Sequence, residues 1–190
     1  MHFLTDFADL GVVLPLAGLV ALSLTVVGRR REALAWTLAI TGTFATMLVL
    51  KLLIFVCLGS AGIRGLANPS GHTAAGVVVY AGLLTLVGER LAPRVPIALL
   101  AGAVFGMLFG FTRLALRYHT LADVLVGGAV GLAGVLVLAK LAGPRRTEAP
   151  ACGLALVATV SLLAVLTLHG TKLHAEAALR SFAAEVRSGG

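Results

Sequence analysis

His119 and Asp123 form the pair of residues in this sequence best suited to attack phosphorus. They stand four residues apart at the expected start of a helix, a spacing that places both side chains on one helix face. A carboxylate there can accept the ring N–H of the histidine and leave the other ring nitrogen free as a nucleophile. The alternative is a capping box, in which Thr120 is the N-cap and Asp123 the third helical residue. One carboxylate has limited reach, so the two interpretations compete for Asp123.

The segment Pro69-Ser70-Gly71-His72 is typical of a helix N-terminus that binds an anion. Serine is a good N-cap, and glycine lets the backbone approach a ligand closely. The free N–H groups and the partial positive charge of such a helix end attract phosphate. The alternative is an ordinary capped helix with a histidine on its surface.

Three cations accompany these motifs. Lys51 lies within an apolar run, several residues before its end. An ionisable side chain there is costly unless it snorkels or faces a polar cavity. Arg113 and Arg117 precede the histidine–aspartate pair. Arg117 is a candidate contact for a second phosphate or an acidic headgroup.

The composition indicates which elements must position these residues. The 190 residues are 59% hydrophobic and 12% charged, and the mean hydropathy of +1.03 is far too high for a soluble domain. A bilayer-spanning helix needs roughly 20 mostly apolar residues. The sequence therefore predicts an all-α, polytopic transmembrane helical bundle of about six helices. The expected spans cover residues 10–28, 33–57, 72–88, 95–112, 120–142 and 152–168.

We expect these spans to form a single domain, residues 1–168, followed by a tail, residues 169–190, that is either a short amphipathic helix or frayed. Cys57 and Cys152 fall near the ends of spans that emerge on opposite sides, so no disulfide is expected. Trp36, near the start of the second span, fits an interfacial aromatic anchor.

The basic residues of the short loops predict the orientation. Most of them fall in the first, third and fifth loops, which are therefore assigned to the cytoplasm: Arg29, Arg30, Arg31, Arg90, Arg94, Lys140, Arg145 and Arg146. Lys51, the serine–histidine segment and the segment from Arg113 to Asp123 then share the outer side. The net charge of +7 does not indicate nucleic-acid binding, because the cations form no groove-sized patch. Small size and short loops favour a bacterial inner membrane, with the site facing the periplasm or exterior.

Together these motifs resemble the type 2 phosphatidic acid phosphatase and haloperoxidase superfamily over residues 33–142. The family has three signatures: a Lys with a downstream Arg-Pro, a Pro-Ser-Gly-His, and a Ser-Arg followed by a spaced His and Asp. The second signature is intact here. The third keeps its spacing but has Thr112 where the family has Ser. The first departs, because position 58 is Leu and the next arginine is Arg64, followed by glycine.

The resemblance implies a role for each residue. His119 would be the nucleophile that forms a phosphohistidine, Asp123 its orienting partner, and His72 the general acid that protonates the leaving oxygen. Cationic side chains take the place of a metal, so neither a metal nor another cofactor is expected. The groups expected to hold the phosphoryl oxygens are Lys51, Arg64, Ser70, Gly71 and Arg113.

The function that the resemblance implies is hydrolysis of a lipid phosphomonoester or pyrophosphate at the outer face of the membrane. The substrate would sit within the bilayer as phosphatidate, phosphatidylglycerol phosphate, an isoprenyl phosphate or pyrophosphate, or a lipid A phosphate. Two alternatives stay open: a lipid-to-lipid phosphotransferase with the same site, and a non-catalytic membrane protein that keeps the fold. The sequence leaves the oligomeric state open.

Overall fold

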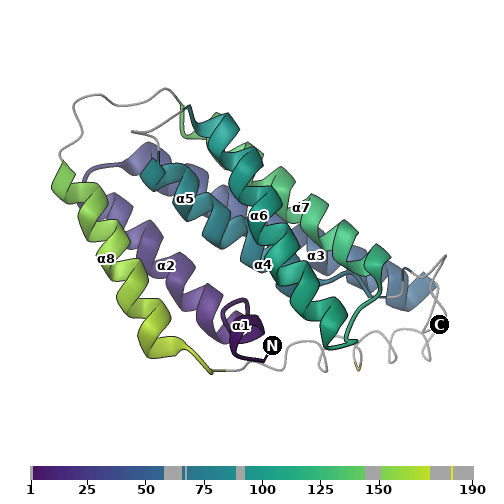
Figure 1. Ribbon diagram of the computed structural model, residues 1–190. Helices are drawn as coiled ribbons and strands as arrows, with labels where there is room; N and C mark the ends of the chain where they lie inside the picture. Colours follow the sequence, from purple (N-terminus) through teal and green to yellow (C-terminus); the bar gives the residue numbers. More distant parts are fainter. Residues whose placement is uncertain are drawn as a thin grey trace.

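A computed structural model describes residues 2–57, 66, 68–88, 93–143, 151–171 and 181. Over these residues the chain folds as a bundle of helices (Figure 1). A short first helix, α1 (His2–Asp6), precedes the long elements. The long elements are α2 (Leu10–Val26), α3 (Arg30–Cys57), the run of α4 (Gly71–Gly76), η2 (Val77–Ala81) and α5 (Gly82–Val87), α6 (Arg94–Ala115), α7 (Leu121–Leu141) and α8 (Ala151–Leu168).

Each of the six expected spans coincides with one long element, and the third corresponds to the run from α4 to α5. The helices α3, α6 and α7 are long and apolar enough to cross a membrane. Shorter apolar helices cover Leu10–Val26, Gly71–Val87 and Ala155–Leu168. The predicted fold class, an all-α membrane bundle, is confirmed. The single domain stays a prediction, and most of the predicted tail, residues 172–180 and 182–190, lies outside the described residues.

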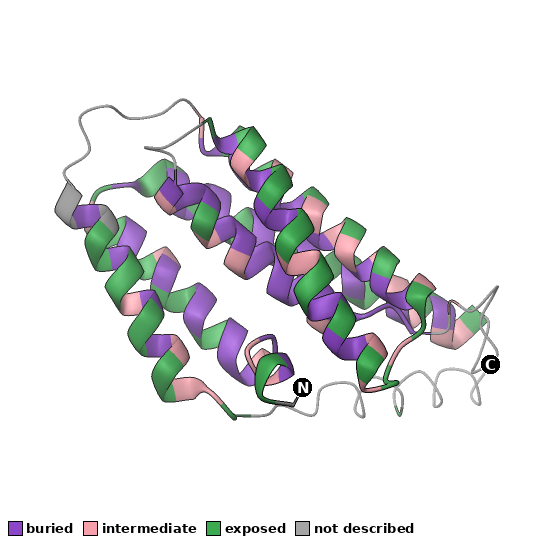
Figure 2. Cartoon of the chain, in the orientation of Figure 1, coloured by how far each residue is buried: buried purple, intermediate pink, exposed green. Residues whose placement is uncertain are grey.

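The surface of the bundle is apolar where a soluble protein would be polar. Leu100, Met107 and Leu166 are each more than 60% exposed, at 70%, 67% and 66%. Figure 2 shows such exposed positions along the outward faces of the helices, with the buried residues where helices meet. Exposed apolar side chains on this scale fit a surface that contacts lipid tails instead of water.

Glycines on α7 let the run from α4 to α5 approach closely, which fixes the position of its start at Ser70. A Cβ atom at Gly127 would collide with the carbonyl oxygen of Ser70, and one at Gly131 would lie 2.8 Å from the carbonyl oxygen of Ala74. The same helix face meets α3, since a Cβ at Gly134 would collide with Thr43 Oγ1. Only glycine permits backbone contact of this kind. The start of α4 is therefore pressed against the start of α7.

Trp36 lies inside this packing and not at an interface. Its side chain is 1% exposed, and its Nε1–H donates to the carbonyl oxygen of Ala17 at 2.9 Å. A Cβ at Gly82 would lie 3.0 Å from the indole ring, so glycine makes room for it. The expectation of an interfacial anchor at Trp36 is wrong, because α2, α3 and α5 enclose the ring and supply its hydrogen-bond acceptor.

A buried ion cluster closes the end of the bundle where α3 and α6 begin. Glu32 is 1% exposed and pairs with Arg29 at 3.2 Å and with Arg94 at 3.5 Å. Arg94 also donates to the carbonyl oxygen of Gly143, just beyond α7. Arg31 donates to the carbonyl oxygen of Leu141 at 2.9 Å. The cluster, called here the Glu32 end, joins the starts of two helices to the end of a third.

Candidate active site

The start of α7 carries both of the arrangements that the sequence allowed. The Asp123 N–H donates to Thr120 Oγ1 at 3.2 Å, and Asp123 Oδ2 accepts from the Thr120 N–H at 3.1 Å, which completes a capping box. The same Oδ2 lies 3.7 Å from Nδ1 of His119. The carboxylate thus caps the helix and faces the histidine at once, so the two interpretations are compatible.

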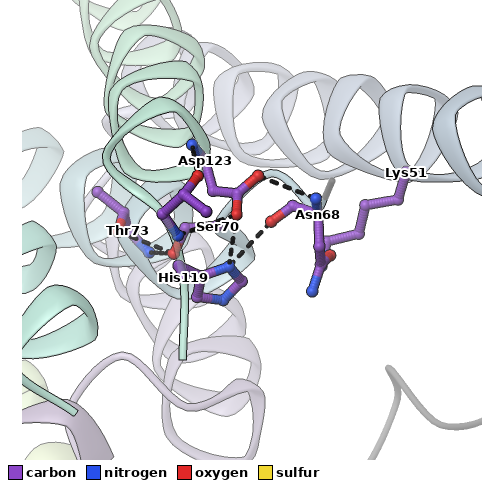
Figure 3. Close-up of polar contacts among 7 residues, drawn as sticks. Lys51, Asn68, Ser70, Thr73, His119 and Asp123 are labelled. Carbon is purple, nitrogen blue, oxygen red and sulfur yellow. Dashed lines mark hydrogen bonds and ion pairs between the residues drawn. The ribbon is translucent and has the colours of Figure 1, made fainter. Parts of the chain in front are cut away.

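A backbone carbonyl, and not the carboxylate, is the near acceptor for the His119 ring. The Asn68 carbonyl oxygen lies 2.9 Å from Nδ1 (Figure 3). A carbonyl oxygen can only accept, so Nδ1 carries the proton and Nε2 keeps its lone pair. The Asn68 N–H in turn donates to Asp123 Oδ1 at 2.9 Å. The ring is 3% exposed and held in the tautomer that a nucleophile needs.

Lys51 points into this group. Its Nζ donates to Oδ1 of Asn68 at 2.7 Å, and the residue is 8% exposed. A Cβ at Gly71 would lie 3.6 Å from Lys51 Cε, so the lysine runs beside the first residue of α4. Asn68 therefore contacts Lys51, His119 and Asp123. Sequence reasoning gave it no role, although it directly precedes the Pro-Ser-Gly-His motif.

Ser70 anchors the start of α4. Its backbone N–H donates to the carbonyl oxygen of Asp123 at 2.9 Å. Its hydroxyl oxygen accepts from the Thr73 N–H at 3.3 Å and from the Thr73 hydroxyl at 2.9 Å. Ser70 is fully buried. The N-cap predicted from the motif is confirmed, and the cap sits beside the His119 group (Figure 3).

His72 and Arg113 face a different part of the chain, the N-terminal segment. His72 Nε2 lies 3.5 Å from Asp9 Oδ2. The other carboxylate oxygen of Asp9 accepts from the Gly11 N–H at 2.9 Å and caps α2. Arg113 Nη1 donates to Thr5 Oγ1 at 3.1 Å. Asp9 and Thr5 were missed from sequence because they belong to no motif and lie more than 60 residues from their partners.

Arg113 is also held by the ring of Tyr118, which lies 4.5 Å from its Cζ. The turn after α6 creates this contact. The Tyr118 N–H donates to the Arg113 carbonyl at 3.1 Å and the Arg117 N–H donates to the Leu114 carbonyl at 3.0 Å. This pair of bonds is a Schellman motif. The motif carries the chain from the end of α6 at Ala115 to His119 across three intervening residues.

Arg117 occupies the left-handed position of that turn, with φ of 54°. Its side chain is exposed, and its backbone conformation is one that usually takes glycine. Arg64, the other uncertain phosphate ligand, lies outside the described residues. Among the described residues, no group of three or more His, Cys, Asp or Glu side chains is arranged to hold a metal.

Comparison with known families identifies the class of protein to which this site belongs. The sequence profile of the PAP2 superfamily matches residues 33–147, which is more than half of the chain. The protein belongs to the PAP2 superfamily and has its phosphatase-type fold. The matched range contains Lys51, Asn68, Ser70, His72, Arg113, His119 and Asp123. No curated protein and no solved structure matched the chain.

Proposed function

We propose that this membrane protein is a lipid phosphate phosphatase that works through a phosphohistidine. The observation that carries the proposal is the tautomer of His119. Its Nδ1–H is directed at the Asn68 carbonyl oxygen at 2.9 Å, which leaves Nε2 as the nucleophile. The surrounding groups, a buried lysine and the capped start of α4, favour an anion beside that nitrogen.

In the first step His119 Nε2 attacks the phosphorus atom and the bond from phosphorus to the lipid oxygen breaks. His72 donates a proton to that oxygen, so the lipid leaves as an alcohol, or as a lipid monophosphate from a pyrophosphate. Asp123, 3.7 Å from Nδ1, offsets the positive charge that the ring gains. Lys51, Arg113, Ser70 and the Gly71 N–H supply the donors for the three phosphoryl oxygens.

In the second step His72 accepts a proton from water. The water oxygen attacks phosphorus, the phosphorus–nitrogen bond breaks, and inorganic phosphate leaves. Asp9 faces His72 at 3.5 Å and is the group placed to hold the imidazole in position for both transfers. The proposed substrate is a lipid phosphate or pyrophosphate in the bilayer, approached from the periplasmic or exterior side of a bacterial inner membrane.

The decisive experiment measures phosphate released from a panel of lipid phosphates in detergent, with EDTA present. The native chain is compared with His119→Ala, and radiolabelled substrate is used to trap phosphate on the protein. Acid-labile, alkali-stable label that His119→Ala abolishes would support the mechanism. Phosphate release that persists in His119→Ala, or that EDTA stops, would contradict it.

Two other functions share this site. A phosphotransferase would form the same phosphohistidine but release phosphate only to an acceptor lipid, so release into water without acceptor excludes it. A non-catalytic protein would form no phosphohistidine, and His119→Ala would then behave like any packing variant. The ring tautomer favours either enzyme over the non-catalytic protein, and phosphate release into water separates the hydrolase from the phosphotransferase.

A further inference from the structure

An apolar cavity of about 400 Å³ lies between α6 and α8, next to α1. Its wall includes Phe7 just after α1, Tyr80 of η2, Phe105 of α6 and Leu162 of α8. Leu162 is 60% exposed, so the cavity opens on the outer surface of the bundle, where a membrane protein meets lipid. We call it the α6–α8 groove. Its volume lies within the range of ligand pockets, roughly 300–1,000 Å³.

The wall of the groove offers only apolar contacts. Two of its residues carry hydroxyl groups, and each hydroxyl is directed at a backbone carbonyl. Tyr80 donates to the Phe7 carbonyl oxygen at 2.7 Å, and Ser161 donates to the Val157 carbonyl oxygen at 2.7 Å. The rings of Tyr80 and Phe105 lie 5.8 Å apart and form one side of the groove. A hydrocarbon chain is the ligand that such a wall suits.

The groove begins one helical turn from the candidate active site. Phe109 lines the groove and precedes Arg113 by four residues in α6, which is about 6 Å along the helix axis. Phe7 lines it from the other side and lies between Thr5 and Asp9. Those two residues contact Arg113 and the proposed general acid. The same short segment thus borders both the polar site and the apolar groove.

We infer that the α6–α8 groove binds a hydrocarbon chain of the lipid phosphate substrate and sets the preference for chain length. The inference rests on the proposed function. A phosphate held near Arg113 leaves the attached chain one turn away from the groove. The apolar wall and the membrane-facing opening then let the chain lie along α6 while the headgroup stays at the helix ends.

A pair of neighbouring substitutions on α8 tests this inference. Leu162→Trp adds bulk at a residue that lines the groove, whereas Leu163→Trp adds the same bulk next to it, at a residue outside the groove wall that is 56% exposed. Both variants are assayed with alkyl phosphates of increasing length and with the water-soluble p-nitrophenyl phosphate. We expect Leu162→Trp to lower kcat/KM for long chains about tenfold, the loss of contact for two methylenes.

The matched control defines the result. Leu163→Trp should leave the chain-length profile unchanged, and both variants should hydrolyse p-nitrophenyl phosphate like the native chain. Equal profiles for the two variants would overturn the inference. So would an equal loss on soluble and lipid substrates, since that would point to a change in the fold and not to chain binding.

A binding measurement separates this inference from the proposed chemistry. An alkyl phosphate with a diazirine in its chain is crosslinked to the native protein and to His119→Ala, and the labelled peptides are found by mass spectrometry. Label on Phe105, Phe109 or Leu162 supports the groove even if the native protein releases no phosphate. Absence of phosphate release would by itself refute only the proposed phosphatase activity. Label that a phosphate-free alcohol of the same length gives equally would show bulk lipid there and overturn the inference.

Discussion

Charged side chains are buried at both ends of the bundle, but the two ends use them differently. On α3, Glu32 and Lys51 are 19 residues apart, and on α6 so are Arg94 and Arg113, a separation of about 28 Å. At the Glu32 end the arginines bind a carboxylate and backbone carbonyls that join helices. At the other end, called here the site end, Lys51 donates to the Asn68 side chain and the Asn68 carbonyl oxygen holds the His119 ring (Figure 3).

The difference teaches what turns a buried polar cluster into a candidate site. Arginine keeps its proton, and an arginine–glutamate cluster closed by backbone carbonyls serves to fix helices in place. A histidine with one nitrogen protonated and the other unprotonated can exchange protons and form a bond to phosphorus. We therefore expect substitutions at the site end to reduce catalysis and substitutions at the Glu32 end to reduce stability.

The largest effect is expected at His119. His119→Gln should lower kcat for lipid phosphate at least about 1,000-fold, as loss of a nucleophile does in other covalent mechanisms. The free energy of unfolding should fall by only about 1 kcal/mol, for one hydrogen bond to Asn68. Activity and unfolding in detergent are measured on the same preparation. A variant that unfolds but keeps its activity per folded molecule would reverse the proposed contrast.

The matched substitution at the opposite end is Glu32→Gln. It removes the carboxylate that both Arg29 and Arg94 contact, and leaving buried cations without their partner costs about 3–5 kcal/mol. The activity per folded molecule should stay at the native level. Replacing Glu32 and both arginines together by apolar residues should restore part of the stability. A fall in kcat at native stability would show that the Glu32 end acts on the chemistry.

Asp9 tests whether the N-terminal segment belongs to the site. Asp9→Asn keeps an N-cap for α2 but removes the charge that faces His72. We expect a loss in kcat/KM, which reports formation of the phosphohistidine, of about 10- to 100-fold for an alkyl phosphate, whose leaving oxygen needs a proton. The loss for p-nitrophenyl phosphate should be much smaller, because that leaving group departs without one. Equal losses on both substrates would assign Asp9 to folding or binding only.

The smallest effect is expected at Arg117, in the turn that ends α6. Glycine occupies the left-handed position after α2, α7 and α8, at Gly28, Gly143 and Gly170, whereas α6 has Arg117 there. Arg117→Gly should raise the free energy of unfolding by up to about 1 kcal/mol. If Arg117 contacts a second phosphate, the variant should also lose turnover of lipid pyrophosphate relative to monophosphate. Unchanged selectivity would leave Arg117 without a role in the substrate.

Much of the fold followed from local rules. The apolar runs predicted all six long elements, because a helix in a bilayer must satisfy its backbone within itself. The N-caps at Ser70 and Thr120 are contacts within three residues, so each cap and its partner lie together in the sequence. The prediction that Trp36 is an interfacial anchor was wrong, because its burial depends on α2 and on the gap left by Gly82.

By itself the sequence determined the helices, their caps, the family and the chemical types gathered at one end of the bundle, since each depends on composition or on spacing within a few residues. The tertiary structure decided which groups hold those residues. The Asn68 carbonyl that sets the His119 tautomer lies 51 residues away. Asp9, Thr5 and the α6–α8 groove likewise arise only from packing. A backbone carbonyl or a wall of common apolar residues has no signature in sequence, because every chain offers many of them and only the fold selects one.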